Sequence, residues 1–262
     1  MIDERNRVPS LILTRWHQGK RTTGFPATPP ELPERFRGRP QIDSSRCSNG
    51  CRDCVEACPT AALQADPLHL DLGACVFCPV CSEACAPGAI TYTRDHRLAA
   101  STREALVLTD DTRTAPRVEA LDRQMRRVFG RSLRLRQVSA GGCNGCEAEL
   151  TALGNVVFDL SRFGIQFVAS PRHADGIVVT GPVTRNMELA LRKTYEAVPA
   201  PKIVIAVGAC AISGGPFAGS PVAADGVPRD IPVDLYVPGC PPHPLTLLDG
   251  ILRLLGRIES DT

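Results

Sequence analysis

The distribution of cysteine constrains this chain more than any other feature. Twelve of its 262 residues are cysteine, and eight of these lie within Cys47–Cys85. The spacing C-x2-C-x3-C occurs in the block Cys51–Cys58 and again, 27 residues later, in the block Cys78–Cys85. An internal repeat of this kind predicts two similar halves packed about a pseudo-twofold axis.

The cellular compartment determines whether so many thiols form disulfides or bind metal. The N-terminal stretch has no sustained apolar segment and no small-residue cleavage site, so we do not expect a secretory signal. The longest strongly apolar run, residues 203–212, is too short for a membrane span of about 20 residues. Because thiols stay reduced in the cytosol, disulfides are not expected, and the cysteines are predicted to bind metal.

The eight-cysteine segment has the spacing of a bacterial ferredoxin with two 4Fe–4S clusters. In such a run the first three thiolates bind one cubane, and the fourth binds the cubane of the other half. The predicted ligand sets are Cys47, Cys51, Cys54 and Cys85 for the first cluster, and Cys75, Cys78, Cys81 and Cys58 for the second. A zinc site or redox-active thiols are the alternatives.

This segment departs from the usual ferredoxin run at two points. Three residues, rather than two, separate Cys47 from Cys51, and Ala86 stands between Cys85 and the following proline. Both changes bear on loop geometry and on the reduction potential. Neither removes a ligand.

The composition along the chain predicts four segments. Residues 1–46, rich in Pro and Arg, are expected to form an extended arm, because proline removes backbone donors. Residues 47–92 form the α+β ferredoxin-like domain, and residues 93–132 a connector with a helix over 117–129. Residues 133–262 alternate short β-branched runs with helical stretches, which predicts an α/β domain with a mostly parallel sheet.

The expected elements of this last domain follow from the hydrophobic periodicity. The expected strands are 133–138, 165–169, 176–180, 203–207 and 233–237. The expected helices are 145–160, 186–196 and 245–257.

The four remaining cysteines come directly after predicted strands. Cys143 and Cys146 follow the first strand, Cys210 follows the fourth and Cys240 the fifth. Since the carboxyl ends of parallel strands share one edge of a sheet, these thiols are expected to meet there. They are predicted to hold a third 4Fe–4S cluster, with structural zinc as the alternative.

Glycines accompany these four cysteines and allow the backbone to approach a bulky cofactor closely. The predicted cofactor-binding positions are Gly142, Gly145, Gly208 and Gly239. Further polar residues lie nearby. Glu147 and Glu149 are expected either to interact with the helix dipole at a helix start or to take part in proton coupling. His243 is expected either to tune the cluster or to pack against its neighbours.

Two longer segments of the C-terminal half resemble a known family. The stretch SRFGIQFVASPRHADGIVVTGPVTRNMELALRKTYEAVPAPKIVIAVGACAISGG and the stretch VPGCPPHP are similar to the small subunits of respiratory complex I and of the complex-I-related, membrane-bound nickel–iron hydrogenases. The resemblance covers roughly residues 118–256. It implies a flavodoxin-like fold of the complex I small-subunit type and a 4Fe–4S cluster held by the four matching cysteines.

The resemblance also implies partners. The N-terminal 92 residues are similar to the ferredoxin-type subunit of the same complexes, so the chain resembles a fusion of two neighbouring subunits. It implies a catalytic large subunit, membrane-arm subunits, an electron donor such as a formate dehydrogenase, and peripheral attachment at the cytoplasmic side of the cell membrane.

One detail distinguishes the branches of this family. Asn144 and Gly145 separate the first two cysteines, and the form CNGCE resembles the hydrogenases more than complex I, whose motif begins with adjacent cysteines. A quinone reductase, a nickel-free relative and a freestanding ferredoxin-like carrier are the alternatives.

We expect no substrate-converting site on this chain. The sequence offers no nucleophile–base pair, no open metal site and no dinucleotide-binding glycine fingerprint after a strand. A formal net charge of only +2 does not suggest nucleic-acid binding. These features predict an electron-transfer subunit with three 4Fe–4S clusters.

Overall fold

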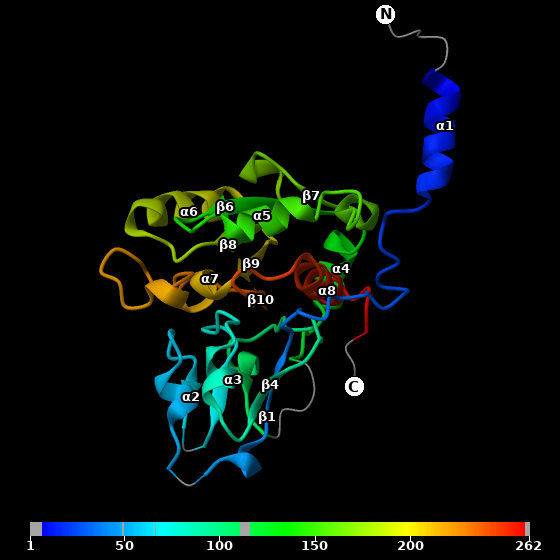
Figure 1. The fold of residues 1–262 in the computed structure, drawn as a ribbon. Helices are drawn as coiled ribbons and strands as arrows, with labels where there is room; N and C mark the ends of the chain where they lie inside the picture. Colours follow the sequence, from blue (N-terminus) through cyan, green and yellow to red (C-terminus); the bar gives the residue numbers. More distant parts are fainter. Residues whose placement is uncertain (1–6, 49, 66, 111–115, 260–262) are drawn as a thin grey trace, which may run out of the picture.

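Five parallel strands form the sheet of the C-terminal half (Figure 1). They are β6 (Leu133–Ser139), β7 (Ile165–Phe167), β8 (Gly176–Thr180), β9 (Ile203–Val207) and β10 (Leu235–Val237). Their order, β10-β9-β8-β6-β7, is the flavodoxin-like order 2-1-3-4-5 when the strands are counted from β6. The expected α/β class with a parallel sheet is therefore confirmed.

Both faces of this sheet are buried. The structure is a computed structural model that describes residues 7–48, 50–65, 67–110 and 116–259. The central strands β8 and β9 are buried at every position, as expected for parallel strands covered by helices on both sides. Ile203 and Ile205 pack into a core on one face, and Val204 between them packs into a core on the other.

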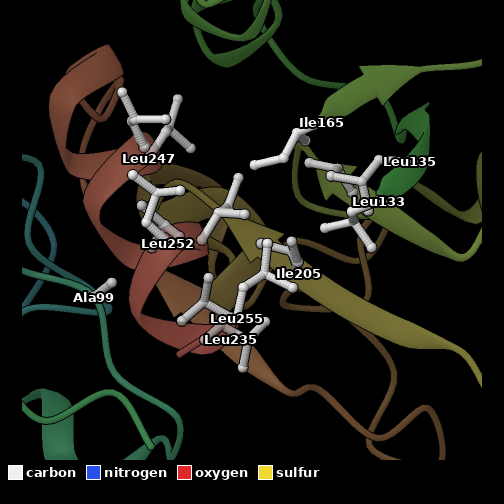
Figure 2. Packing of buried hydrophobic residues seen from close by; sticks show 14 of the residues in the cluster. Ala99, Leu133, Leu135, Ile165, Ile205, Leu235, Leu247, Leu252 and Leu255 are labelled. Carbon is white, nitrogen blue, oxygen red and sulfur yellow. The ribbon is translucent and has the colours of Figure 1, made fainter. Parts of the chain in front are cut away.

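Helices cover the two faces of the sheet. The helices of this half are α4 (Arg123–Phe129), α5 (Gly145–Ala152), α6 (Arg185–Ala197), α7 (Ala209–Ser213) and α8 (Pro244–Leu254). Side chains of α4, α5 and α8 join the larger core, whereas α6 contributes Leu191 to the other. Figure 2 shows Leu247 and Leu252 of α8 facing Ile205 of the sheet.

Several element bounds differ from the expectation. The helix expected over 117–129 begins only at Arg123, because the Asp122 side chain accepts hydrogen bonds from the amides of Gln124 and Met125 and caps it there. The helix expected over 145–160 ends at Ala152. A separate 3-10 helix, Leu160–Phe163, follows.

The elements of the N-terminal module repeat in space as the cysteines repeat in sequence. The module contains β1 (Pro40–Ile42), α2 (Asp53–Glu56), β2 (Leu63–Gln64), β3 (His69–Asp71), α3 (Val80–Ala84) and β4 (Ile90–Tyr92). In each half a short helix leads to a strand that pairs with an antiparallel neighbour, β2 with β3 and β4 with β1. The two halves share one apolar core.

The connector is more structured than expected. Its residues Val107–Leu108 form β5, which pairs with β3 and so completes a three-stranded sheet of the module. Ala100 bridges to Tyr236 on β10. The connector therefore ties the module to the α/β domain. Its residues 111–115 lie outside the described part of the chain.

The arm is not extended throughout, and in this the expectation was wrong. Helix α1 spans Arg7–Gln18, because its only proline, Pro9, lies in the first turn, where the missing amide costs little. The proline-rich part beyond it has no helix between residues 19 and 43 and lies on the α/β domain, where Phe25 is buried in the main core. None of the helices within the described residues is long and apolar enough to cross a lipid bilayer.

Candidate metal centres

The first four predicted thiols meet at the exposed end of the N-terminal module. Cys47 follows a 3-10 helix, Ser44–Arg46, and Cys54 lies in α2, while Cys85 ends α3. Burial raises the pKa of Cys54, and the neighbouring thiolates of Cys85, Cys47 and Cys51 raise it further. Each member of the set is therefore within electrostatic reach of Cys54.

The second set is enclosed more deeply. The four thiols line one hollow, together with Leu70 and Tyr92; they are Cys58, Cys75, Cys78 and Cys81. Burial raises the pKa of Cys75 to about 12, and the thiolates of Cys81, Cys58 and Cys78 add to this effect. Four thiolates this close would repel one another, so a bound cation would be needed to hold all four thiols deprotonated.

Backbone amides donate to the sulfurs at equivalent positions of the repeat. The amide of Ala62 donates to Cys58 Sγ at 3.3 Å, and the amide of Ala89 donates to Cys85 Sγ at 3.2 Å. Such donors stabilise thiolates and raise the reduction potential of a bound cluster. These donors were not predicted from the sequence, although both alanines stand four residues after the last cysteine of their block.

A tyrosine also contacts the second set and was not predicted from the sequence. The Tyr92 hydroxyl donates to the carbonyl oxygen of Cys78 at 2.7 Å and lies 3.6 Å from Cys81 Sγ. Burial is the main cause that raises the pKa of Tyr92, so the hydroxyl keeps its proton. The residue fixes the loop that carries Cys78.

The third set of thiols meets at the carboxyl edge of the five-stranded sheet. Strands β6, β8, β9 and β10 end at one level, because their last residues pair in a row: Ser139 with Thr180, Thr180 with Val207, and Val207 with Val237. Beyond these ends, Cys143 and Cys240 lie in loops, whereas Cys146 lies in the first turn of α5 and Cys210 in the first turn of α7. The amide of Ala209 donates to the carbonyl oxygen of Gly239 at 2.9 Å and joins the start of α7 to the loop of Cys240.

Electrostatics link the four thiols of this edge. Burial raises the pKa of Cys146 to about 12, followed by the effects of Glu147, Cys210, Cys240 and Cys143. The thiols of Cys143 and Cys240 are exposed, whereas Cys210 is buried. The third set is thus exposed to solvent on the side of Cys143 and Cys240.

The glycines of this edge serve two different needs. A Cβ on Gly208, whose φ is +86°, would lie 2.6 Å from Cys146 Sγ, and one on Gly145 would make an ordinary contact with Cys143 Sγ. A Cβ on Gly239 would collide with the backbone of Pro242, and one on Gly142 would press on Gly181. Of the four predicted glycines, Gly208 leaves room beside sulfur, Gly239 and Gly142 permit close backbone packing, and a Cβ at Gly145 would fit without a clash.

Glu147 is more than a dipole partner at a helix start. Its carboxylate is buried and accepts hydrogen bonds of 2.6 Å from the hydroxyls of Ser139 and Thr180. Burial alone would raise its pKa, but these two hydrogen bonds outweigh burial and hold the pKa below its ordinary value. Glu147 ties the loop of Cys143 and Cys146 to the ends of β6 and β8.

His243 packs against aromatic rings and caps the start of α8. Its Nδ1 accepts a hydrogen bond from the amide of Leu245 at the start of α8, and its ring lies edge-on to Phe36 and Phe158. Burial lowers its pKa, and the neighbouring His96 lowers it further. His243 is thus a neutral ring at the junction of the arm and the α/β domain.

The donor sets fit cubane clusters. Within the described residues, no three His, Cys, Asp or Glu side chains are arranged to hold a single metal ion. A cubane takes each thiolate at a different iron atom, so its ligands stand further apart than those of one ion. Four thiols per set, amide donors to sulfur, and the space that Gly208 leaves beside Cys146 are the features that such a cluster needs.

Comparison with known proteins identifies the family. Residues 143–254 match the model of the NADH ubiquinone oxidoreductase 20 kDa subunit. The chain is 44% identical over 144 residues to the probable membrane-bound hydrogenase subunit mbhJ of Pyrococcus furiosus, a match that covers 55% of this chain and 86% of the relative. The chain belongs to the 20 kDa subunit family.

Two further members show the breadth of the 20 kDa subunit family. An NADH-quinone oxidoreductase subunit of Heliobacterium modesticaldum is 48% identical over 122 residues, with 46% of this chain and 70% of the relative covered. Formate hydrogenlyase subunit 7 of Escherichia coli is 45% identical over 130 residues, with 50% of this chain and 51% of the relative covered. The family match contains all four thiols of the third set and leaves the N-terminal module outside it.

Proposed function

We propose that this chain is an electron-transfer subunit that carries three 4Fe–4S clusters. The observation that supports it best is the placement of the twelve thiols in three groups of four, with none left over: the second group lines one hollow, and in the first and third groups the other three thiols raise the pKa of Cys54 and of Cys146. When bound, the clusters would supply one-electron carriers. The first set is Cys47, Cys51, Cys54 and Cys85, the second Cys58, Cys75, Cys78 and Cys81, and the third Cys143, Cys146, Cys210 and Cys240.

The two halves have complementary roles in this proposal. The N-terminal module acts as a two-cluster ferredoxin domain, and the α/β domain holds the third cluster. The Ser213 hydroxyl on α7 donates to the carbonyl oxygen of Gly73 at 2.9 Å, and Ile212 packs against the core of the module. This contact joins the loop before Cys75 to the helix that carries Cys210. We propose that electrons pass between the second and third sets here.

The partner at the third site is a large subunit with a nickel–iron centre. The exposed thiols of Cys143 and Cys240 mark the surface that this subunit covers. The names of the relatives, a membrane-bound hydrogenase and a formate hydrogenlyase, support a membrane-associated complex with membrane-arm subunits. In this assignment a formate dehydrogenase or another electron donor delivers electrons to the exposed first set, at the cytoplasmic side of the membrane.

A quinone reductase is the second candidate. The 48% identity to part of an NADH-quinone oxidoreductase supports it, whereas the two residues between Cys143 and Cys146 favour the hydrogenase. The adjacent reading frames distinguish the two, because a nickel–iron large subunit carries four nickel-ligating cysteines and a quinone-reactive one does not.

Iron content and paramagnetic spectra test the proposal. The protein purified without oxygen should contain about twelve irons per chain, four for each cluster. Cys240→Ser should remove one paramagnetic species, spare the other two and abolish electron delivery to the large subunit. About eight irons in the unaltered protein, or full activity of the variant, would refute the third cluster.

A further inference from the structure

Helix α1 stands apart from the rest of the molecule (Figure 1), and several of its apolar side chains are exposed to solvent. Leu11, Ile12, Leu13 and Trp16 are 66%, 65%, 52% and 77% exposed. Ile12 and Trp16 lie one helical turn apart, and Leu13 borders them on the same side, whereas Thr14 and Gln18 lie opposite. An apolar group of this size on a soluble surface marks an interaction site. The metal centres do not use this helix.

Positive charge surrounds these side chains. From Arg7 to Pro30 the sequence has no acidic residue and four permanently basic ones, Arg7, Arg15, Lys20 and Arg21. A shallow groove on the helix is lined by apolar Leu11, Ile12 and Trp16 together with cationic Arg15 and Lys20. The partner must therefore offer an apolar interior beside negative charge.

The helix is fixed close to the α/β domain. The amide of Thr23 donates to the carbonyl oxygen of Val157 at 2.8 Å, and Arg162 donates to the carbonyl oxygens of Thr23 and Phe25. Only residues 19–22 link α1 to this anchor. Twelve helical residues extend about 18 Å, which is enough to lie along a membrane surface.

We propose that α1 is an interfacial helix that binds an anionic lipid bilayer directly. Trp16, Ile12 and Leu13 enter the boundary between headgroups and acyl chains, as in other amphipathic interfacial helices. Arg15, Lys20 and Arg21 bind lipid phosphates. The chain then attaches to the membrane through its own N-terminal helix as well as through its partners. This extends the proposed peripheral location and does not depend on the number of clusters.

The single tryptophan makes the proposal directly measurable. Trp16 is the only tryptophan in the chain, so the intrinsic fluorescence of the full-length, iron-loaded protein reports on α1 alone. Phosphatidylglycerol-containing vesicles should shift its emission to the blue, and brominated acyl chains should quench it. Phosphatidylcholine vesicles should give little change. No shift with either kind of vesicle, or the same shift with both, would overturn the proposal.

Flotation of variants with these vesicles supplies the control. Ile12→Glu should abolish flotation, whereas Leu189→Glu should float normally, since Leu189 is 63% exposed on α6, away from the helix. Neutralising Arg15, Lys20 and Arg21 to Gln should weaken binding about fivefold for each charge. Equal flotation of the two Glu variants would contradict the proposal, as would binding of α1 to an acidic partner protein without any binding to lipid. Unchanged iron content in every variant separates these outcomes from loss of the clusters.

Discussion

At the scale of single residues, the third site depends on the absence of a side chain at position 208. Gly208 has a φ of +86°, and a methyl group there would lie 2.6 Å from Cys146 Sγ. Glycine therefore serves backbone conformation and space beside a ligand at once. Glu147 complements it, because its buried carboxylate holds the hydroxyls at the ends of β6 and β8.

Gly208→Ala should disable the third site alone. Gly208 has a φ of +86° and a ψ of 156°, a backbone region essentially restricted to glycine, so a side chain there costs about 1–3 kcal/mol, and the methyl group must also displace the Cys146 sulfur. We expect iron to fall from about twelve to about eight per chain, with the paramagnetic species of the other two clusters intact. Gly219→Ala is the matched control, since Gly219 has a φ of +75° and nothing within 4 Å of an added Cβ. Equal iron loss in both variants would show that backbone strain alone explains the effect.

At the scale of elements, the sequence predicted most accurately the strands that are buried on both faces. Strands β8 and β9 have the predicted bounds, because a run such as Ile203–Val207 is apolar at every position. Strand β5 was missed because two residues, Val107–Leu108, are too few for any period to show. Helix α1 was missed because the proline content of the whole arm masked a stretch with one proline in its first turn.

The candidate sites likewise contain features that the sequence predicted and features that it did not. Cysteine spacing and aligned strand ends predicted which thiols lie near one another, because short loops leave few other arrangements. That each group binds a cluster stays a prediction. The contact of the Tyr92 hydroxyl with the loop of Cys78 depends on tertiary packing, and no sequence pattern indicates it. The amides of Ala62 and Ala89 make local contacts, four residues after a cysteine, and only the repeat of that position along the chain indicates them.

The contact between the loop of Gly73 and helix α7 gives a prediction at this scale. A Cβ on Gly73 would lie 2.7 Å from Ile212 Cγ2 and 2.8 Å from the Arg103 guanidinium. Gly73→Val should therefore push the module away from α7 and slow electron exchange between the second and third sites. Freeze-quenched spectra after rapid reduction would show the third cluster lagging. Full iron content should accompany the delay, and an unchanged rate would mean that electrons do not cross at this contact.

At the scale of the whole molecule, the arm and the connector hold the two halves together. Phe25 from the arm packs edge-on against His96 of the connector, and Phe36 packs in the same way against His243 of the α/β domain. His96 is buried, with 8% of its surface exposed, and His243 is half-buried. The junction thus contains two neighbouring histidines that must stay neutral while the halves are packed.

Stability should consequently fall as the pH drops below about 6.5. Burial lowers the pKa of His96 and of His243 below the ordinary 6.5. Below that pH the unfolded chain therefore binds more protons at these two residues than the folded chain does. The stabilisation is complete above the unfolded pKa and declines below it, by at most about 1.4 kcal/mol per pH unit for each histidine. Denaturant unfolding of the iron-loaded protein between pH 8 and pH 5 measures this slope.

His243→Asn should reduce the slope, because one of the two groups no longer titrates. Asparagine keeps an acceptor for the amide of Leu245, so the cap of α8 survives. Carboxyl groups titrate equally in both proteins, and the difference between the two curves therefore isolates His243. The exposed His173→Asn is the control, because His173 lies outside the junction and its substitution leaves both junction histidines in place. The same slope in all three proteins would mean that the junction does not sense protons.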